Sequence, residues 1–200
     1  MNNSDPTNII ITGVGGQGNI FASQLVAGAA INEGWHASIG ETYGASQRGG
    51  SVMSHVRLSK KYQVGPLISS GEAHIIVGFE PLETLRVMLE YGNPETEIIV
   101  NPRPTYPIGV MAGTMTYPPV EKIIKAMEEV VSKVARVPAT DIAQDCGVAL
   151  AQNVVMVGAL AGSSYLPLKV ASFEQILKET FSGDKLEMNL EAFRRGVAGI

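Results

Sequence analysis

The segment that most limits the possible folds is residues 8–34, which reads as a strand, a glycine-rich turn and a helix. Its first residues, NIIITG, are an apolar run rich in β-branched side chains that ends in glycine. The sequence GNIFASQLVAGAAINEG follows and is typical of a helix with Gly34 at its C-terminal cap. Residues 35–40, WHASIG, then predict a second strand. This order predicts a β-α-β unit whose two strands are parallel and joined by a right-handed crossover.

The rest of the chain continues the alternation of strands and helices. Further strands are expected at residues 51–59, 72–80, 97–101 and 134–138, and further helices at residues 82–91, 119–132, 147–162, 172–181 and 186–197. Residues 41–50 are expected to form a loop, and Ser172 with Gln175 predicts a capping box. The pattern predicts the α/β class: a single domain over residues 1–200, with a mainly parallel, Rossmann-like sheet flanked by helices. Residues 1–7 are expected to be a flexible N-terminal tail.

Composition excludes several classes of partner. The 15 Lys and Arg residues are scattered and the net charge is -4, so a nucleic-acid partner is not expected. The N-terminal stretch is polar, and the apolar runs after it fall short of the roughly 18 residues a membrane span needs, which indicates a cytoplasmic protein with no membrane contact. Cys146 is the single cysteine. A single cysteine excludes an internal disulfide and cannot hold an iron–sulfur cluster alone. Cys146 is expected to be a small buried apolar residue.

The glycine turn matches a dinucleotide fingerprint. Gly13, Gly15 and Gly18 have the G-x-G-x-x-G spacing between a strand and a helix, and Glu41 stands loosely where a ribose-binding acid would. The pattern alone leaves open a second interpretation, in which the glycines only let strand and helix pack closely. A hydride-transfer enzyme also needs a general acid or base. The candidates for this acid or base are His36, His55 and His74, and none of them has an obvious carboxylate partner.

A second stretch changes the interpretation. The turn GVGGQGN is followed by ETYGASQRGGSVMSHVRLS at residues 41–59, by HIIVGFEPLETLR, and by NVVMVGALAG ahead of FEQILKETF. Over nearly the whole chain this combination resembles the gamma-type domain family of pyruvate/2-oxoacid:ferredoxin oxidoreductases. The resemblance is strongest to the small subunits of the indolepyruvate enzymes. The glycine turn is common to many folds, whereas its pairing with Y-G-x-S-Q-R-G-G is specific.

The resemblance implies a subunit of a thiamine-dependent oxidoreductase that is inactive alone. Such an enzyme oxidatively decarboxylates a 2-oxoacid, here indolepyruvate or another aryl pyruvate, joins the acyl group to coenzyme A and passes electrons to ferredoxin. Thiamine diphosphate, magnesium and the 4Fe–4S clusters are expected in a large partner subunit within a hetero-oligomer. This chain is expected to bind none of them alone and to contribute no metal site and no catalytic residue.

The expected contacts with coenzyme A or with the partner's site come from two segments: Gly13, Gly15, Gly16, Gly18, Ser46, Gln47, Arg48 and Gly49. Amides at a helix N-terminus attract a phosphate, and the fork of donors on Arg48 suits a phosphate or carboxylate. Both segments are expected at the same edge of the sheet. Two alternatives stay open: Arg48 pairs with Glu41 and pins the loop, or the glycine turn only packs against the partner.

Other polar and sulfur-containing residues are assigned structural roles. Asn153 is expected to hydrogen-bond a neighbouring loop. The methionines Met111, Met115 and Met156 are expected in the core or at a subunit interface. Two rival functions remain from the sequence: a stand-alone NAD-dependent oxidoreductase, and a subunit that serves assembly only.

Overall fold

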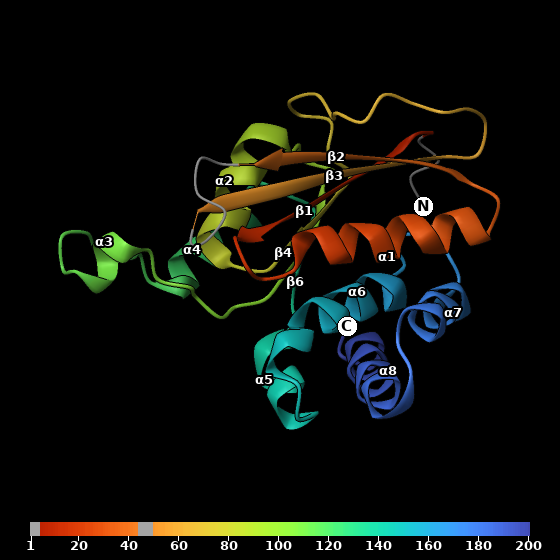
Figure 1. The fold of residues 1–200 in the computed structure, drawn as a ribbon. Coiled ribbons are helices and arrows are strands. Elements are labelled where there is room, and N and C mark those ends of the chain that lie inside the picture. Colours follow the sequence, from red (N-terminus) through yellow and green to blue (C-terminus); the bar gives the residue numbers. More distant parts are fainter. Residues whose placement is uncertain (1–4, 44–49) are drawn as a thin grey trace.

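A computed structural model describes residues 5–43 and 50–200. Its centre is a six-stranded sheet with the strand order β2-β3-β1-β4-β5-β6 (Figure 1). The strands are β1 (Thr7–Val14), β2 (His36–Tyr43), β3 (Ser51–Ser59), β4 (Ile75–Gly78), β5 (Glu97–Val100) and β6 (Lys133–Arg136). The pairs β1·β4, β4·β5 and β5·β6 are parallel, and β3 is antiparallel to both of its neighbours. The expected α/β class with a mainly parallel sheet is confirmed.

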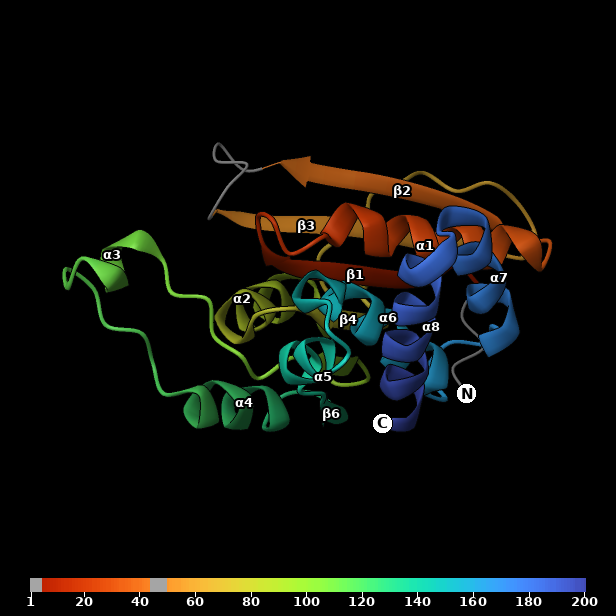
Figure 2. The same cartoon turned by 60° about the horizontal axis from the view of Figure 1, so that its bottom comes forward.

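Helices cover both faces of this sheet (Figure 2). The helices are α1 (Asn19–Asn32), α2 (Pro81–Tyr91), α3 (Ile108–Met111), α4 (Val120–Glu128), α5 (Ala139–Asp145), α6 (Gln152–Gly162), α7 (Val170–Thr180) and α8 (Gly183–Ala198), with a 3-10 turn at Ala149–Ala151. One apolar core lies between the sheet and α1, α5, α6, α7 and α8. A second core joins the other face of the sheet to α2 and α4. Within residues 5–43 and 50–200, no helix is long and apolar enough to cross a bilayer.

The apolar run at the start of the chain supplies both cores. Ile9 and Ile11 point into the core under α1 and α6, whereas Ile10 points into the core under α2 and α4. All three side chains are fully buried. Successive side chains of a strand alternate between faces, so a strand covered on both sides needs three apolar residues in a row. This is why β1 can occupy the middle of the sheet.

The first β-α-β unit differs from the expectation in one respect. β1 and β2 run in the same direction, but they are not neighbours, because β3 lies between them and pairs antiparallel with each. β2 also continues to Tyr43, so the loop expected to begin at Glu41 starts later. At the N-terminus, β1 begins at Thr7, which pairs with Leu58, so the range expected to be a tail overlaps the strand by one residue.

The start of α7 also differs from the prediction. The expected capping box is wrong, because α7 begins at Val170, and the Ser172 hydroxyl donates a hydrogen bond of 2.7 Å to Oε1 of Glu33. The backbone N–H of Lys169 donates to the same oxygen at 2.7 Å. A carboxylate at the end of α1 therefore caps α7, where it also interacts favourably with the helix dipole.

The helix predicted at residues 147–162 is divided, since a 3-10 turn precedes α6. α6 and α8 then approach each other so closely that glycine is required. A Cβ on Gly158 would lie 2.2 Å from the carbonyl oxygen of Phe193, and a Cβ on Gly196 would lie 2.1 Å from that of Val155. Contacts this short do not occur in proteins, so the two helices meet backbone to backbone.

We expect Gly158→Ala to destabilise the protein by about 2–3 kcal/mol, because separating the two helices costs more than the helix propensity gained from alanine. The matched control is Gly65→Ala, where a Cβ would meet no atom within 4 Å. The control should stay within about 0.5 kcal/mol of the parent protein. Urea unfolding followed by circular dichroism measures both; equal stabilities would contradict the close crossing of α6 and α8.

Candidate functional site

A pocket of about 500 Å³ lies where β1 ends and α1 begins. Its lining combines the glycine turn, the first turn of α1 and the adjoining parts of β2 and β3: Gly15, Gly16, Gly18, Asn19, Ile20, Glu41, Thr42 and Val52. In an open α/β sheet the carboxyl ends of parallel strands form the usual ligand crevice. The pocket lies at that edge.

Hydrogen bonds within the chain fix the glycine turn. The N–H of Val14 donates to Oε1 of Gln17 at 2.7 Å, and the N–H of Gln17 donates to the carbonyl oxygen of Val14 at 3.1 Å. The N–H of Gly15 donates to the carbonyl oxygen of Gly50 at 2.8 Å. This last bond joins the turn to Gly50, which directly precedes β3.

Two of the glycines need a left-handed backbone. Gly16 has φ 102° and Gly18 has φ 89°. A Cβ on Gly18 would also lie 2.2 Å from Nδ2 of Asn153, so the turn rests directly on the start of α6. Asn153 packs against the glycine turn, and its amide oxygen accepts from the N–H of Val154 in its own helix, so its expected hydrogen bond to a neighbouring loop stays a prediction.

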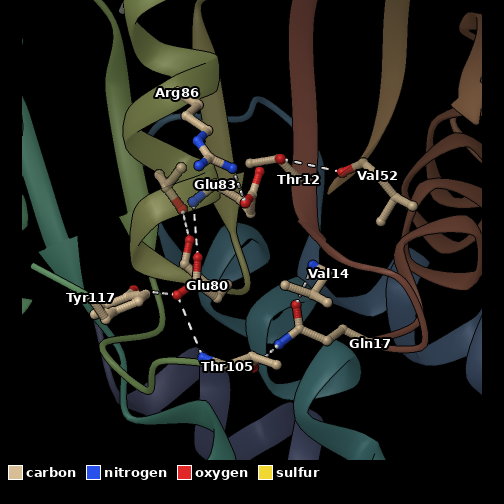
Figure 3. A network of polar contacts seen from close by, with 10 residues as sticks. Thr12, Val14, Gln17, Val52, Glu80, Glu83, Arg86, Thr105 and Tyr117 are labelled. Atoms are coloured by element: carbon tan, nitrogen blue, oxygen red, sulfur yellow. Dashed lines mark hydrogen bonds and ion pairs between the residues drawn. The ribbon is translucent and has the colours of Figure 1, made fainter. Parts of the chain in front are cut away.

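The side chain of Gln17 crosses the ends of the central strands (Figure 3). Its Nε2 donates to the carbonyl oxygen of Phe79 at 3.2 Å and to Oγ1 of Thr105 at 3.3 Å. A Cβ on Gly13 would lie 2.5 Å from Oε1 of Gln17, so the amide covers Gly13 as well. The side chain of Gln17 thus joins the glycine turn to the end of β4 and to Thr105.

Glu41 is held by two hydroxyl groups. Oγ of Ser23 donates to its Oε1 at 3.1 Å, and Oγ of Ser54 donates to its Oε2 at 2.6 Å. Because β3 separates β2 from β1, Glu41 lies two strand spacings, about 10 Å, from β1 rather than on the adjacent strand. Glu41 is the one charged residue among the described residues of the lining, so positive potential there comes from the N-terminus of α1.

Glu80 is the centre of a second polar group, linked to the glycine turn through Thr105 and Gln17. It is 1% exposed, it precedes α2 as the N-cap residue, and its Oε2 accepts from the N–H of Glu83 at 2.9 Å. Its Oε1 accepts from the N–H of Thr105 at 3.4 Å and from the hydroxyl of Tyr117 (Figure 3). Burial raises the pKa of Glu80 although these three hydrogen bonds oppose the shift, and burial with the Glu80 hydrogen bond raises the pKa of Tyr117.

The structure brings together part of the predicted site. Gly15, Gly16 and Gly18 line the pocket, whereas Gly13 lies beneath Gln17. Ser46, Gln47, Arg48 and Gly49 lie outside the described residues, so their contacts and the Arg48–Glu41 pair remain predictions. The sequence reasoning missed four residues that join the turn to α2 and to the segment before α4: Gln17, Glu80, Thr105 and Tyr117. For Glu80 a signal was present in Pro81, since proline is enriched at the first helical position and so marks the residue before it as the N-cap.

Comparison with known proteins gives the family. The family model described as pyruvate ferredoxin/flavodoxin oxidoreductase matches residues 8–199. The chain belongs to this family. Within it, a curated relative named indolepyruvate oxidoreductase subunit IorB, from Archaeoglobus fulgidus, is 39% identical over 189 residues, which are 94% of this chain and 92% of the relative. The resemblance seen in the sequence is confirmed.

Solved structures agree on the fold of this oxidoreductase family. Pyruvate oxidoreductase subunit PORC from Thermotoga maritima superposes with a TM-score of 0.70 at 22% identity, covering 98% of this chain and 97% of that one. The 2-oxoglutarate:ferredoxin oxidoreductase of Magnetococcus marinus gives a TM-score of 0.72 at 22% identity. That match covers 98% of this chain but 31% of the longer Magnetococcus chain. The same fold therefore occurs as a separate chain and as part of a larger one.

The residues of this family member do not fit an iron–sulfur cluster. Cys146 is its one cysteine, while a cluster takes about four thiolates. Within residues 5–43 and 50–200, no three His, Cys, Asp or Glu side chains gather closely enough to hold a metal ion. Cys146 lies at the end of α5 and packs against the first core, but it is only partly buried, less than the prediction of a buried apolar residue implies.

We expect Glu80 to make stability depend on pH. The pKa of Glu80 in the folded protein lies above its ordinary value of 4.5, so the folded state binds more protons and stability falls as pH rises through that interval. Glu80→Gln removes this ionisation. The stability difference, variant minus parent, should grow with pH from 4.5 by up to about 1.4 kcal/mol per pH unit and then level off.

Urea unfolding between pH 4.5 and 8 checks this expectation. Tyr117→Phe is the companion variant: it removes a hydrogen bond that favours the ionised carboxylate, so it should extend the interval to higher pH. Parallel stability curves for all three proteins would show that the burial of Glu80 does not control its ionisation.

Proposed function

We propose that this chain is the small subunit of a 2-oxoacid:ferredoxin oxidoreductase that acts on indolepyruvate. The observation that carries the proposal is the 39% identity to the Archaeoglobus fulgidus IorB subunit over nearly the full length of both chains. The reaction is the oxidative decarboxylation of the 2-oxoacid, with transfer of the acyl group to coenzyme A and of the electrons to ferredoxin. On this proposal the isolated chain is inactive.

The metal-ligating residues of the chain support an assignment of the cofactors to the other subunit. With a single cysteine, it depends on a large partner for the 4Fe–4S clusters, and we assign thiamine diphosphate and magnesium to the same partner. Anaerobic co-expression of the chain with that large subunit, followed by an assay for indolepyruvate- and coenzyme A-dependent reduction of a viologen dye, tests the proposal. No dye reduction by the purified complex would overturn it.

We assign the pocket beside the glycine turn to the coenzyme A side of the reaction. The N-terminus of α1 and the backbone amides of Gly16 and Gly18 suit a phosphate group, with Gly15 lining the same pocket. The same assignment includes Ser46, Gln47, Arg48 and Gly49, with Arg48 as the cationic donor. The Magnetococcus marinus enzyme, which shares the fold, was solved with coenzyme A bound.

A stand-alone NAD enzyme is the less favoured function. Glu41, the residue in the ribose-binding position of the fingerprint, is held by Ser23 and Ser54 on a strand that does not adjoin β1. Titration of the isolated chain with NADH should give no saturable binding. A role in assembly alone is separated from the coenzyme A role by the variant described next.

We expect Ile20→Glu to raise the apparent KM for coenzyme A by about tenfold, because a carboxylate in the pocket repels a phosphate and fills the space. Ile20 lines the pocket and is 45% exposed. The matched control is Ile31→Glu, which adds the same charge at a position that is 58% exposed on the same face of α1, three turns from the pocket. The control should keep the parental KM.

Steady-state kinetics of the two reconstituted variants measure this effect, with complex formation followed in parallel. If Ile20→Glu weakens complex formation and leaves the KM for coenzyme A unchanged, the pocket is a contact between subunits and its coenzyme A role is wrong. An unchanged KM with unchanged assembly would remove both roles from the pocket.

A further inference from the structure

The segment between β5 and α4 stands away from the rest of the molecule. Figures 1 and 2 show α3 at its tip, with an extended connection on either side. Residues 104–119, which we call the arm, contain no Asp, Glu, Lys, Arg or His. Three of its exposed side chains are large and apolar: Tyr106 is 51% exposed, Met111 70% and Met115 61%. A projecting segment that lacks charge and exposes large apolar groups is typical of a buried contact with another protein.

The arm has a defined conformation at its tip. The N–H groups of Thr114 and Met115 donate to the carbonyl oxygen of Gly109 at 2.9 and 3.0 Å, and the N–H of Gly113 donates to that of Val110 at 3.0 Å. Gly113 closes this turn with φ 73°. The tip is therefore folded on itself, and its two methionines are presented on a fixed frame. Methionine side chains adapt to an irregular apolar surface better than branched ones do.

The base of the arm is also fixed. Its two ends meet where the rings of Tyr106 and Tyr117 pack edge to face at 5.2 Å between centroids. Thr105 at one end and Tyr117 at the other both donate hydrogen bonds to the buried carboxylate of Glu80. Docking such a segment costs little conformational entropy, because the order required for binding is already present.

The position of the arm indicates which partner it meets. Thr105 accepts a hydrogen bond from Gln17, so the base of the arm lies beside the glycine turn and the pocket. A protein that covers the pocket edge would also reach the arm. A second copy of this chain fits less well, because two arms packed on each other supply at most 16 residues a side, fewer than the roughly 20 to 30 of a stable interface. A large partner can enclose the tip and share the pocket edge.

We propose that the arm docks into an apolar recess of the large subunit, with Met111 and Met115 as its buried contacts. This inference rests on the proposed function, since it deepens the identity of the partner named there. The arm carries no charge, so the recess that receives it should be lined by aliphatic and aromatic side chains. Glu80 and Tyr117 act as positioning residues that hold the arm in place for docking.

The test compares two variants of the chain binding to the large subunit. Met111→Glu places a charge in the proposed contact and should raise the Kd of the complex by about thirtyfold, as for a central interface residue. Leu89→Glu is the matched control. It makes the same charge change at the same 70% exposure. Leu89 lies in the last turn of α2, near the amino end of β4, and its substitution should change the Kd by less than about twofold. Biolayer interferometry under anaerobic conditions measures both constants.

The outcomes separate this inference from the proposed function. If the parent chain binds the large subunit and supports dye reduction while Met111→Glu binds equally well, the arm inference is overturned and the proposed function stands. If the parent chain neither binds nor supports dye reduction, both are overturned. Sedimentation of the isolated chain completes the test: self-association that Met111→Glu abolishes would make a second copy the occupant and would overturn the docking on the large subunit.

Discussion

The requirement that β1 be buried on both faces determines most of this structure. Three consecutive isoleucines satisfy it, with Ile10 in one core and Ile9 and Ile11 in the other. Because both faces are apolar, one helical layer must lie on each side of the sheet, and the chain has to cross between layers after the strands. The glycine turn follows directly from β1. Its place at the carboxyl edge, with the pocket beside it, is therefore a consequence of how the strand is buried.

Contacts between residues that are distant in the sequence connect the glycine turn to other parts of the protein. The glycine turn has the spacing of a dinucleotide fingerprint, yet Gln17 reaches from it to the end of β4 and to Thr105. Glu80 continues the connection to Tyr117 and α2. Burying a carboxylate is unfavourable unless donors surround it, and three donors do so at Glu80. One polar network thus joins the pocket edge to the arm.

The sequence was informative where structure is decided locally. The alternation in residues 51–59 predicts β3, and the pattern of residues 82–91 predicts α2 to within one residue of its observed start. The insertion of β3 between β1 and β2 depends on pairing between distant residues, such as Ile9 with Val56, which periodicity does not encode. The capping box failed for the same reason, since Ser172 bonds to Glu33, which lies 139 positions away.

The site follows the same division between local and distant contacts. The strand–glycine turn–helix order was predictable, and the left-handed backbone of Gly18 falls on a glycine of the motif, whereas that of Gly16 falls between motif positions. The contacts of Gln17 span 62 and 88 positions and were not. The short helices α3 and α5 also went unpredicted, because one or two turns give too little periodicity to recognise.

The close packing of α6 against α8 through their glycines affects how the chain folds during synthesis. α6 is almost entirely apolar and buried, and part of its cover is α8. On a ribosome, α6 leaves the exit tunnel before residues 183–198 do, so for that interval its glycine face has no partner. We expect the nascent chain to be most prone to aggregation then, and released chains truncated before Gly183 to be more readily cleaved by protease than released chains that include Ala198. Completion of α8, rather than of the sheet, would end this vulnerable stage of synthesis.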